Sequence, residues 1–240
     1  MKRIPGALSD VPEPFFTYFG SKHNLAGSYP PPEHDTVIEP FAGSAAYATW
    51  HYKKNVVLYD VYPVICGVWE WLIKATAEDV MRLPINVTDL TELAICQEAK
   101  WLIGFWLKKG NAYPVTIPHA RMRGGLRPDS HWGSMIRARI AKNVYKIKHW
   151  KVHYKSYADA PDEVATWFID PPYTRSGSAY KHYDVEYTQL REWTANRRGQ
   201  VIACGQPGDD WVDFNMSRNI RNVVNGQSVE LLYYRSDECH

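Results

Sequence analysis

The sequence predicts an α/β protein built on one doubly wound, largely parallel sheet with an inserted lobe. A strand–turn–helix–strand pattern occupies residues 36–60, and such a βαβ unit implies parallel strands. Strand patterns return near residue 150, while the segment between is helical, loop-rich and basic. We therefore expect one domain formed by 1–61 and 149–240, with a mainly helical lobe inserted at 62–148.

The first half of the predicted sheet comes from two short apolar runs. TVIEPF at 36–41 is rich in β-branched residues and is stopped by Gly43, which is typical of a buried strand. NVVLYD at 55–60 has the same character and ends on an acid. About 12 small and aromatic residues lie between the two runs and favour a helix.

The chain then turns helical. Thr88 or Asp89 is a suitable N-cap for a helix that runs to Lys108 and Lys109. Gly110 provides the C-terminal stop, because glycine commonly ends a helix in a left-handed conformation.

The middle of the chain carries most of the positive charge. Residues 110–133 are rich in Gly, Pro and Arg and predict a long loop or irregular hairpin, a kind of segment that is usually functional. Residues 134–148 resume a basic helical pattern. Segment 100–155 holds thirteen lysines and arginines against one acid, Asp129, a net charge of +12, whereas the rest of the chain carries −10. This asymmetry favours a polyanion-binding face, the alternative being a solvated helix surface rich in lysine.

The second half of the sheet follows this segment. Three apolar runs predict strands, a periodic stretch precedes the last of them, and an Asn225-Gly226 pair between two further runs is a strong hairpin signal. These elements are, in chain order, strands at 150–156 and 165–171, a helix at 187–198, a strand at 200–205 and the closing hairpin.

Length and composition exclude several classes of protein. A chain of 240 residues with 45% hydrophobic and 22% charged residues can bury a full core and is not typical of disorder. No apolar run approaches the roughly 20 residues of a membrane span, and no secretory signal is visible after the basic start. The four cysteines are far apart and form no CxxC pair, so we expect no metal site and a cytoplasmic location.

Asp170-Pro171-Pro172-Tyr173 directly follows the apolar run ATWFI. Ligands bind beyond the carboxyl ends of strands in open parallel sheets. The two prolines fix the backbone and remove two N–H donors, which leaves a carboxylate, bare carbonyls and an aromatic face. Such a site suits a planar ring that bears an NH2 group, the alternative being a rigid strand-end turn. A chance [DN]PP[aromatic] match in a chain of this length is on the order of 1 in 100 or less.

A small-residue turn, EPFAGSA at 39–45, follows the first predicted strand. Small residues let a ligand approach the backbone closely, but the turn lacks GxGxxG, which disfavours a dinucleotide pyrophosphate. Glu39 adds a negative charge that repels phosphate, so a neutral or cationic nucleoside fits better. Asp60 ends the second strand, where a carboxylate can accept both ribose hydroxyls. Together these signals predict an adenosine-type site.

Four motifs, taken in order, resemble one enzyme family. YFGSK at 18–22, EPFAGSA, Asp60 and DPPY are arranged as in the Dam-like (D12-type, alpha-group) DNA adenine-N6 methyltransferases, most of all the small members carried by phages and prophages. The resemblance covers most of the chain, is highly specific at DPPY combined with YxGxK, and is loose in the insert. It implies a Rossmann-like, S-adenosyl-L-methionine-dependent methyltransferase sheet and a target recognition lobe at 62–148 that binds double-stranded DNA.

The resemblance also implies roles for individual residues. Asp170 takes the catalytic place beside Pro171 and Pro172, and Tyr173 stacks on the target base. The residues expected to bind the cofactor are Tyr18, Gly20, Lys22, Glu39, Phe41, Gly43, Asp60, Ser156, Tyr157 and Asp170. Those expected to contact DNA are the basic-segment residues Arg121, Arg123, Arg127, Arg137 and Arg139, with Tyr180 and Tyr183 handling the flipped nucleotide.

The expected reaction is methyl transfer from S-adenosyl-L-methionine to N6 of a flipped-out adenine, by a monomer or weak dimer in a bacterium or phage host. Whether a cognate restriction nuclease exists stays open. Two features depart from the family: Ala45 replaces a usual second glycine, and the insert lacks the Arg/Asn/Gly pattern of a GATC reader. Two alternatives remain. One is an amino-methyltransferase acting on RNA or on a protein glutamine amide, although the latter group typically shows NPPY. The other is a catalytically inert DNA-binding protein on this scaffold.

Overall fold

A computed structural model describes residues 10–118, 131–174, 180, 184–222 and 226–237. Within these residues the chain forms one mixed sheet of seven strands in the order β3-β2-β1-β4-β5-β7-β6. The strands are β1 (Thr36–Glu39), β2 (Asn55–Asp60), β3 (Lys151–Tyr154), β4 (Ala165–Ile169), β5 (Gly199–Gly205), β6 (Met216–Asn222) and β7 (Gly226–Arg235). The predicted α/β class and mostly parallel sheet are thus confirmed, and each predicted strand is present.

The order of the strands creates a switch point beside β1. The chain runs from β1 outward through β2 to β3, and then returns to β4 on the other side of β1. These strands and β5 are all parallel, with Ile38 opposite Val57 on one side and opposite Trp167 on the other. The carboxyl ends of β1 and β4 therefore diverge into connections that leave in opposite directions, which opens a crevice between them.

Both faces of the sheet are covered, which explains why the central strands β1, β4 and β5 are buried almost throughout. Alternate residues of one strand enter different cores, because successive side chains of a strand point to opposite faces. Phe168 joins a large cluster with Leu102 and Ile136 from the helices, whereas its neighbour Trp167 joins a second cluster with Leu190. The large cluster is continuous from the strands into the helices that follow β2.

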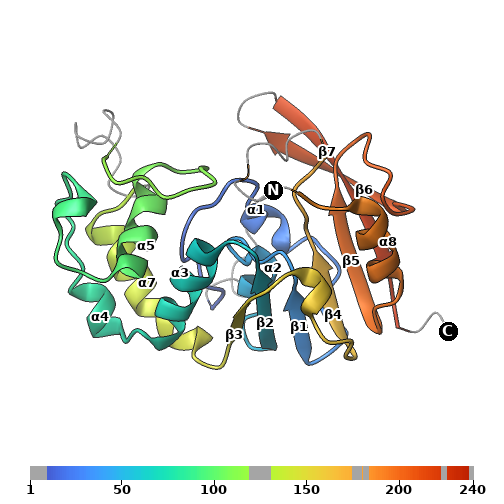
Figure 1. Ribbon diagram of the computed structural model, residues 1–240, viewed down its shortest axis with the longest axis horizontal. Coiled ribbons are helices and arrows are strands. Elements are labelled where there is room, and N and C mark those ends of the chain that lie inside the picture. Colours follow the sequence, from blue (N-terminus) through green and yellow to red (C-terminus); the bar gives the residue numbers. More distant parts are fainter. Residues whose placement is uncertain (1–9, 119–130, 175–179, 181–183, 223–225, 238–240) are drawn as a thin grey trace.

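Helices flank the sheet on both sides, and Figure 1 shows α4, α5 and α7 gathered beyond the β3 edge while α8 lies near β5 and β6. The helices and 3₁₀ turns are α1 (His23–Ala26), α2 (Ala46–Trp50), α3 (Pro63–Lys74), α4 (Ala77–Met81), η1 (Leu90–Glu92), α5 (Gln97–Leu107), α7 (Ser134–Asn143), η2 (Val144–Ile147), η3 (Tyr157–Asp159) and α8 (Tyr187–Ala195). The described residues between β2 and β3 are largely helical, and their forming an inserted lobe stays a prediction. The domain boundaries themselves stay a prediction.

The prediction that Thr88 or Asp89 begins the long helix is wrong. Asp89 does cap a helix, but only the short turn η1, where its Oδ1 accepts from the N–H of Thr91 at 2.8 Å. The N–H of Leu90 is donated to the carbonyl of Thr116 at 2.9 Å, which ties this turn to a distant loop. The long helix α5 starts eight residues after Asp89, at Gln97.

The chain closes with the predicted hairpin. β6 and β7 are antiparallel, with Met216 opposite Leu232 and Asn222 opposite Gly226. β7 also pairs antiparallel with β5 and so joins the hairpin to the parallel strands. Asn225 and residues 119–130 of the predicted loop lie outside the described residues. No helix within the described part of the chain is long and apolar enough to cross a membrane.

Candidate functional site

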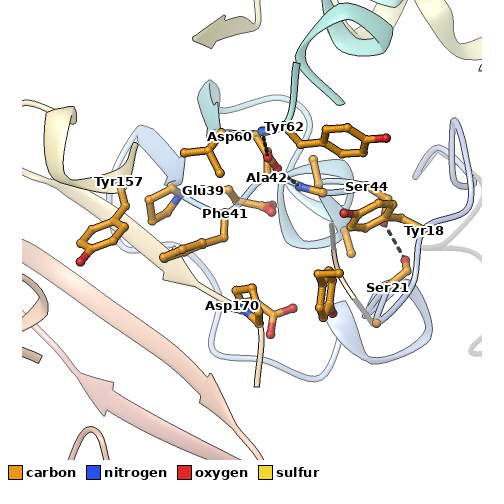
Figure 2. Close-up of a pocket in the computed structure, with 18 of the residues that line it drawn as sticks. Tyr18, Ser21, Glu39, Phe41, Ala42, Ser44, Asp60, Tyr62, Tyr157 and Asp170 are labelled. Atoms are coloured by element: carbon orange, nitrogen blue, oxygen red, sulfur yellow. Dashed lines mark hydrogen bonds between the residues drawn. The ribbon is translucent and has the colours of Figure 1, made fainter. Parts of the chain in front are cut away.

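A pocket opens at the carboxyl ends of β1, β2 and β4, at the switch point of the sheet (Figure 2). Ligands bind at this position in open α/β sheets. All of the residues expected to bind a cofactor line this one pocket. The lining residues are those at 18–22, 39–46, 60–62 and 156–157, together with Phe168, Asp170, Pro172, Tyr180, Asp184 and Val185.

The turn at 39–45 bends the chain sharply from β1 into α2. Gly43 and Ala45 both adopt left-handed backbone conformations, with φ of 45° and 46°. The N–H of Ala45 donates to the carbonyl of Ala42 at 2.6 Å, and the indole N–H of Trp69 donates to the carbonyl of Gly43 at 2.9 Å. A left-handed φ costs a residue with a Cβ about 1–2 kcal/mol. Ala45 therefore keeps the conformation that glycine favours, and the surrounding hydrogen bonds hold it there.

Asp60 connects this turn to the end of β2. Its Oδ2 accepts from the N–H of Gly43 at 3.0 Å, and its Oδ1 accepts from the N–H of Tyr62 at 2.8 Å. These bonds hold the Asp60 carboxylate at the end of β2, on the wall of the pocket. Figure 2 shows Asp60 and Asp170 on opposite sides of the pocket.

Glu39 lines the pocket but is turned toward the start of α2. Its side chain is buried, and Oε1 accepts from the N–H of Ala48 at 2.6 Å. Burial raises the pKa of Glu39 to about 8, against the opposing effect of the Ala48 bond and with a further contribution from Asp170. Burial therefore favours the neutral form of the Glu39 carboxyl group, and the expectation that it presents a negative charge to a ligand stays a prediction.

Lys22 and Asp170 form an ion pair inside the pocket. The Lys22 Nζ lies 3.1 Å from each carboxylate oxygen of Asp170 and 3.2 Å from the carbonyl of Gly20. Burial lowers the pKa of Lys22, but Asp170 and Glu230 outweigh it and hold that pKa above its usual range. Lys22 thus contacts Asp170 directly, a pairing that the expected role in cofactor binding does not include.

Three successive residues, Pro172, Tyr173 and Thr174, each form a hydrogen bond with a different part of the chain. The carbonyl of Pro172 accepts from the hydroxyl of Tyr187 on α8. The hydroxyl of Tyr173 donates to Glu230 on β7, and the hydroxyl of Thr174 donates to Asp209 after β5. These anchors hold the segment rigidly against the sheet.

Tyr173 points inward rather than into the pocket. Its ring lies 4.6 Å from the Lys22 Nζ, and its hydroxyl lies 3.2 Å from Glu230 Oε1. Pro172 lines the pocket, but Pro171 and Tyr173 do not. The expected stacking of Tyr173 on a target base is therefore not supported, because Tyr173 does not line the pocket.

Aromatic rings form much of the wall. Phe41 and Tyr157 stack with ring centroids 5.3 Å apart, and Tyr18 contacts Tyr180 at 5.9 Å. A Cβ on Gly43 would lie 3.1 Å from the ring of Tyr18, so a larger residue there would push this ring away. The pocket therefore offers flat apolar surfaces at both ends of an acidic centre.

The two described arginines of the expected DNA-contacting set are engaged within the chain. Arg137 donates to the carbonyl of Leu83 at 2.7 Å. Arg139 pairs with Glu13 at 2.7 Å, and its guanidinium lies 5.1 Å from the centroid of the Trp106 ring. Both therefore have structural roles. Of the rest of the set, Tyr180 is described and lines the pocket. The remaining residues lie outside the described part of the chain: Arg121, Arg123, Arg127 and Tyr183.

The sequence did not indicate two buried residues that lie behind the pocket, Glu230 and Tyr29. Glu230 is 2% exposed, and its Oε2 accepts from the hydroxyl of Tyr29 at 2.7 Å. The available signal was a lone acid inside the apolar run VELLYY of the closing hairpin. A buried acid in a strand is expected to have partners, but their identity depends on contacts across the fold.

Comparisons with known proteins add little. No family model and no curated protein matches the chain. Among solved structures, a conserved hypothetical protein from Streptococcus pyogenes is similar with a TM-score of 0.34 and 10% sequence identity, over 85% of this chain and 88% of that chain. A similarity this low carries no inference about function.

Proposed function

We propose that this protein transfers the methyl group of S-adenosyl-L-methionine to N6 of a flipped-out adenine in DNA. The observation that carries the proposal is the placement of Asp60, the 39–45 turn and Asp170 around one pocket at the switch point. The sequence motifs that resemble the Dam-like family supply the reaction class. The geometry supports it by bringing those motifs together from four separate parts of the chain.

The pocket residues suit a nucleoside that carries a positive charge. Asp60, Asp170 and Asp184 surround the pocket with one ammonium, Lys22, among them. Electron-rich aromatic faces attract cations, and Tyr18, Tyr157 and Phe41 provide such faces. Asp60 is the residue that would hold the ribose hydroxyls, with the small-residue turn giving room for close approach. When bound, S-adenosyl-L-methionine supplies a methyl group that its sulfonium already activates.

Asp170 would prepare the attacking nitrogen. The N6 lone pair of adenine is delocalised into the ring, so it is a weak nucleophile until its N–H groups are held. Asp170 lines the pocket and can accept one of them, which helps to free the lone pair to form the N–C bond as the S–C bond breaks. The positive charge then lies on N6, where Asp170 stabilises it before the proton leaves.

Access to N6 requires the base to leave the duplex, which costs a few kcal/mol. An aromatic ring that stacks on the base returns ~1–3 kcal/mol of this. Because Tyr173 is turned toward Lys22, Tyr180 on the pocket wall is the described ring better placed for this role.

A second candidate is the same transfer to an amino group of RNA or of a protein. Arg137 and Arg139, two of the arginines expected to hold duplex DNA, make contacts within the chain, so these contacts do not single out DNA as the acceptor. The pocket chemistry is the same in both cases, so only the acceptor differs.

The proposal is tested with S-adenosyl-L-methionine bearing a radioactive methyl group and three separate acceptors: unmethylated duplex DNA, RNA and mixed protein. Digestion of the DNA to nucleosides is expected to give the label in N6-methyladenine. Label in RNA or protein alone supports the second candidate. No transfer to any acceptor, with cofactor binding intact, supports the inert alternative and contradicts the proposal.

A further inference from the structure

Glu230 lies behind the pocket and contacts three side chains, those of Tyr29, Tyr173 and Lys22. Its side chain is 1% exposed, and it lies on β7, far in the chain from Lys22, Tyr29 and Tyr173. Oε2 accepts from the hydroxyl of Tyr29 at 2.7 Å. Oε1 accepts from the hydroxyl of Tyr173 at 3.2 Å and lies 3.6 Å from the Lys22 Nζ. Glu230 does not line the pocket, so it can act on a ligand only through its neighbours.

Lys22 lies between two carboxylates that differ in exposure. The side chain of Asp170 is 22% exposed and reaches the pocket, whereas Glu230 is closed off from it. One ammonium shared by two carboxylates leaves an excess of negative charge in the cluster. A buried carboxylate is costly unless it is paired and hydrogen-bonded. Burial raises the pKa of Glu230, and Lys22 with the hydroxyls of Tyr29 and Tyr173 opposes that effect.

We propose that Glu230 is a positioning residue that fixes Lys22 and Tyr173 and shares the charge of the Lys22 ammonium. Sharing keeps Lys22 from neutralising Asp170 fully, so Asp170 retains the charge with which it accepts a hydrogen bond from an amine. The kinetic part of this inference rests on the proposed methyl transfer. The structural part, that Glu230 holds Lys22, does not.

The kinetic test is Glu230→Gln, which keeps the size of the side chain and an acceptor for Tyr29 but removes the charge. We expect kcat to fall at least tenfold while the KM and Kd for S-adenosyl-L-methionine change less than threefold. Glu230→Asp retains the charge on a shorter side chain and is expected to recover part of the lost kcat. A purely structural role would not separate kcat from KM in this way.

Glu33→Gln is the matched control. Glu33 also accepts from a tyrosine hydroxyl, that of Tyr234 at 2.7 Å, and it does not line the pocket. We expect Glu33→Gln to keep wild-type kcat. An unchanged kcat in folded Glu230→Gln, or equal losses in Glu230→Gln and Glu33→Gln, overturns the kinetic part.

The structural test is independent of activity. The ¹H–¹⁵N signal of the Lys22 ammonium, assigned through its loss in Lys22→Arg, is expected to shift in Glu230→Gln and to stay in place in Glu33→Gln. If Glu230→Gln does not fold, Tyr29→Phe removes one donor to Glu230 and is expected to shift the same signal. An unmoved signal overturns the inference. A shifted signal in a protein that transfers no methyl group instead contradicts the proposed function and leaves the positioning role intact.

Discussion

Burial raises the pKa of Glu39, which the position of this residue in the sequence does not predict. An acid at the carboxyl end of a strand, at the edge of the sheet where ligands bind, is expected to face the ligand with a negative charge. In the structure its carboxyl group is buried and its pKa is raised to about 8. The identity of the residue was visible in the sequence, but its direction depends on the N–H of Ala48, which only the fold brings to it.

The raised pKa of Glu39 makes stability depend on pH. In the unfolded chain its pKa is near 4.5, so between about 4.5 and 8 the unfolded state loses the proton while the folded state keeps it. The contribution to stability is therefore complete below pH 4.5 and is lost as the pH rises toward 8. We expect urea midpoints to fall less between pH 5 and pH 8 for Glu39→Gln than for the wild type. The same change in both proteins would contradict this.

Asp60 is expected to act on the cofactor and not on DNA. Replacement by alanine removes the acceptor at the end of β2, so we expect the affinity for S-adenosyl-L-methionine to fall at least tenfold in calorimetry. DNA affinity is expected to stay within twofold. Asp89→Ala is a matched control, because Asp89 also accepts from the N–H two residues ahead but does so away from the pocket. Equal cofactor affinity in the wild type and Asp60→Ala would remove Asp60 from the site.

At the scale of elements, Lys148 of the basic middle segment stabilises a helix of the same chain. The Lys148 Nζ donates to the carbonyls of Leu72, Ile73 and Ala75 at the end of α3. Cations stabilise the carboxyl end of a helix through its exposed carbonyls. Charge counting on the sequence cannot separate such a contact from a nucleic-acid contact, because both need the same residue type.

Lys148→Met is therefore expected to lower the free energy of unfolding by about 1 kcal/mol. Methionine keeps most of the apolar stem but loses the three donated hydrogen bonds. The exposed Lys142 on α7 gives the control Lys142→Met, which is expected to change stability by less than about 0.5 kcal/mol. Chemical denaturation of both variants decides this, and equal effects would show that Lys148 does not cap α3.

Arg139 offers a second test at this scale. Because it pairs with Glu13 and covers Trp106, Arg139→Gln is expected to lower the melting temperature and to leave the salt dependence of DNA affinity unchanged. A lost phosphate contact would instead reduce the salt slope by about one unit. A reduced slope at an unchanged melting temperature would restore Arg139 to the DNA-binding set.

Elements were predictable where local pattern alone decides them. The runs that form β1 and β4 are mainly apolar and almost entirely buried, since both faces of these strands are covered. The start of α5 was not predictable from its cap residues, because Asp89 is an equally good cap for the short turn that precedes it. The hydrogen bond from Leu90 to Thr116 favours that turn, and it joins residues far apart in the chain.

At the scale of the whole molecule, the residues that line the pocket were predictable from the sequence. The buried residues behind them were not. Strand ends of a parallel sheet meet at one edge, so motifs at 39–45, Asp60 and Asp170 were expected to converge. Tyr29 and Glu230 are 201 positions apart and touch only because the antiparallel β7 lies beside β5. No local pattern carries that information.

The central claim is that Asp170 carries out the chemistry of this pocket, and the turnover of Asp170→Asn tests it most directly. Asparagine keeps the shape and removes the charge that stabilises the attacking nitrogen, a loss that is expected to cost ~10²-fold or more in kcat. The Kd for S-adenosyl-L-methionine is expected to stay within threefold. Asp213→Asn, at a surface pair with Arg191, is the control and is expected to keep full turnover. If Asp170→Asn kept more than about a tenth of wild-type turnover, the assignment of Asp170 would be wrong.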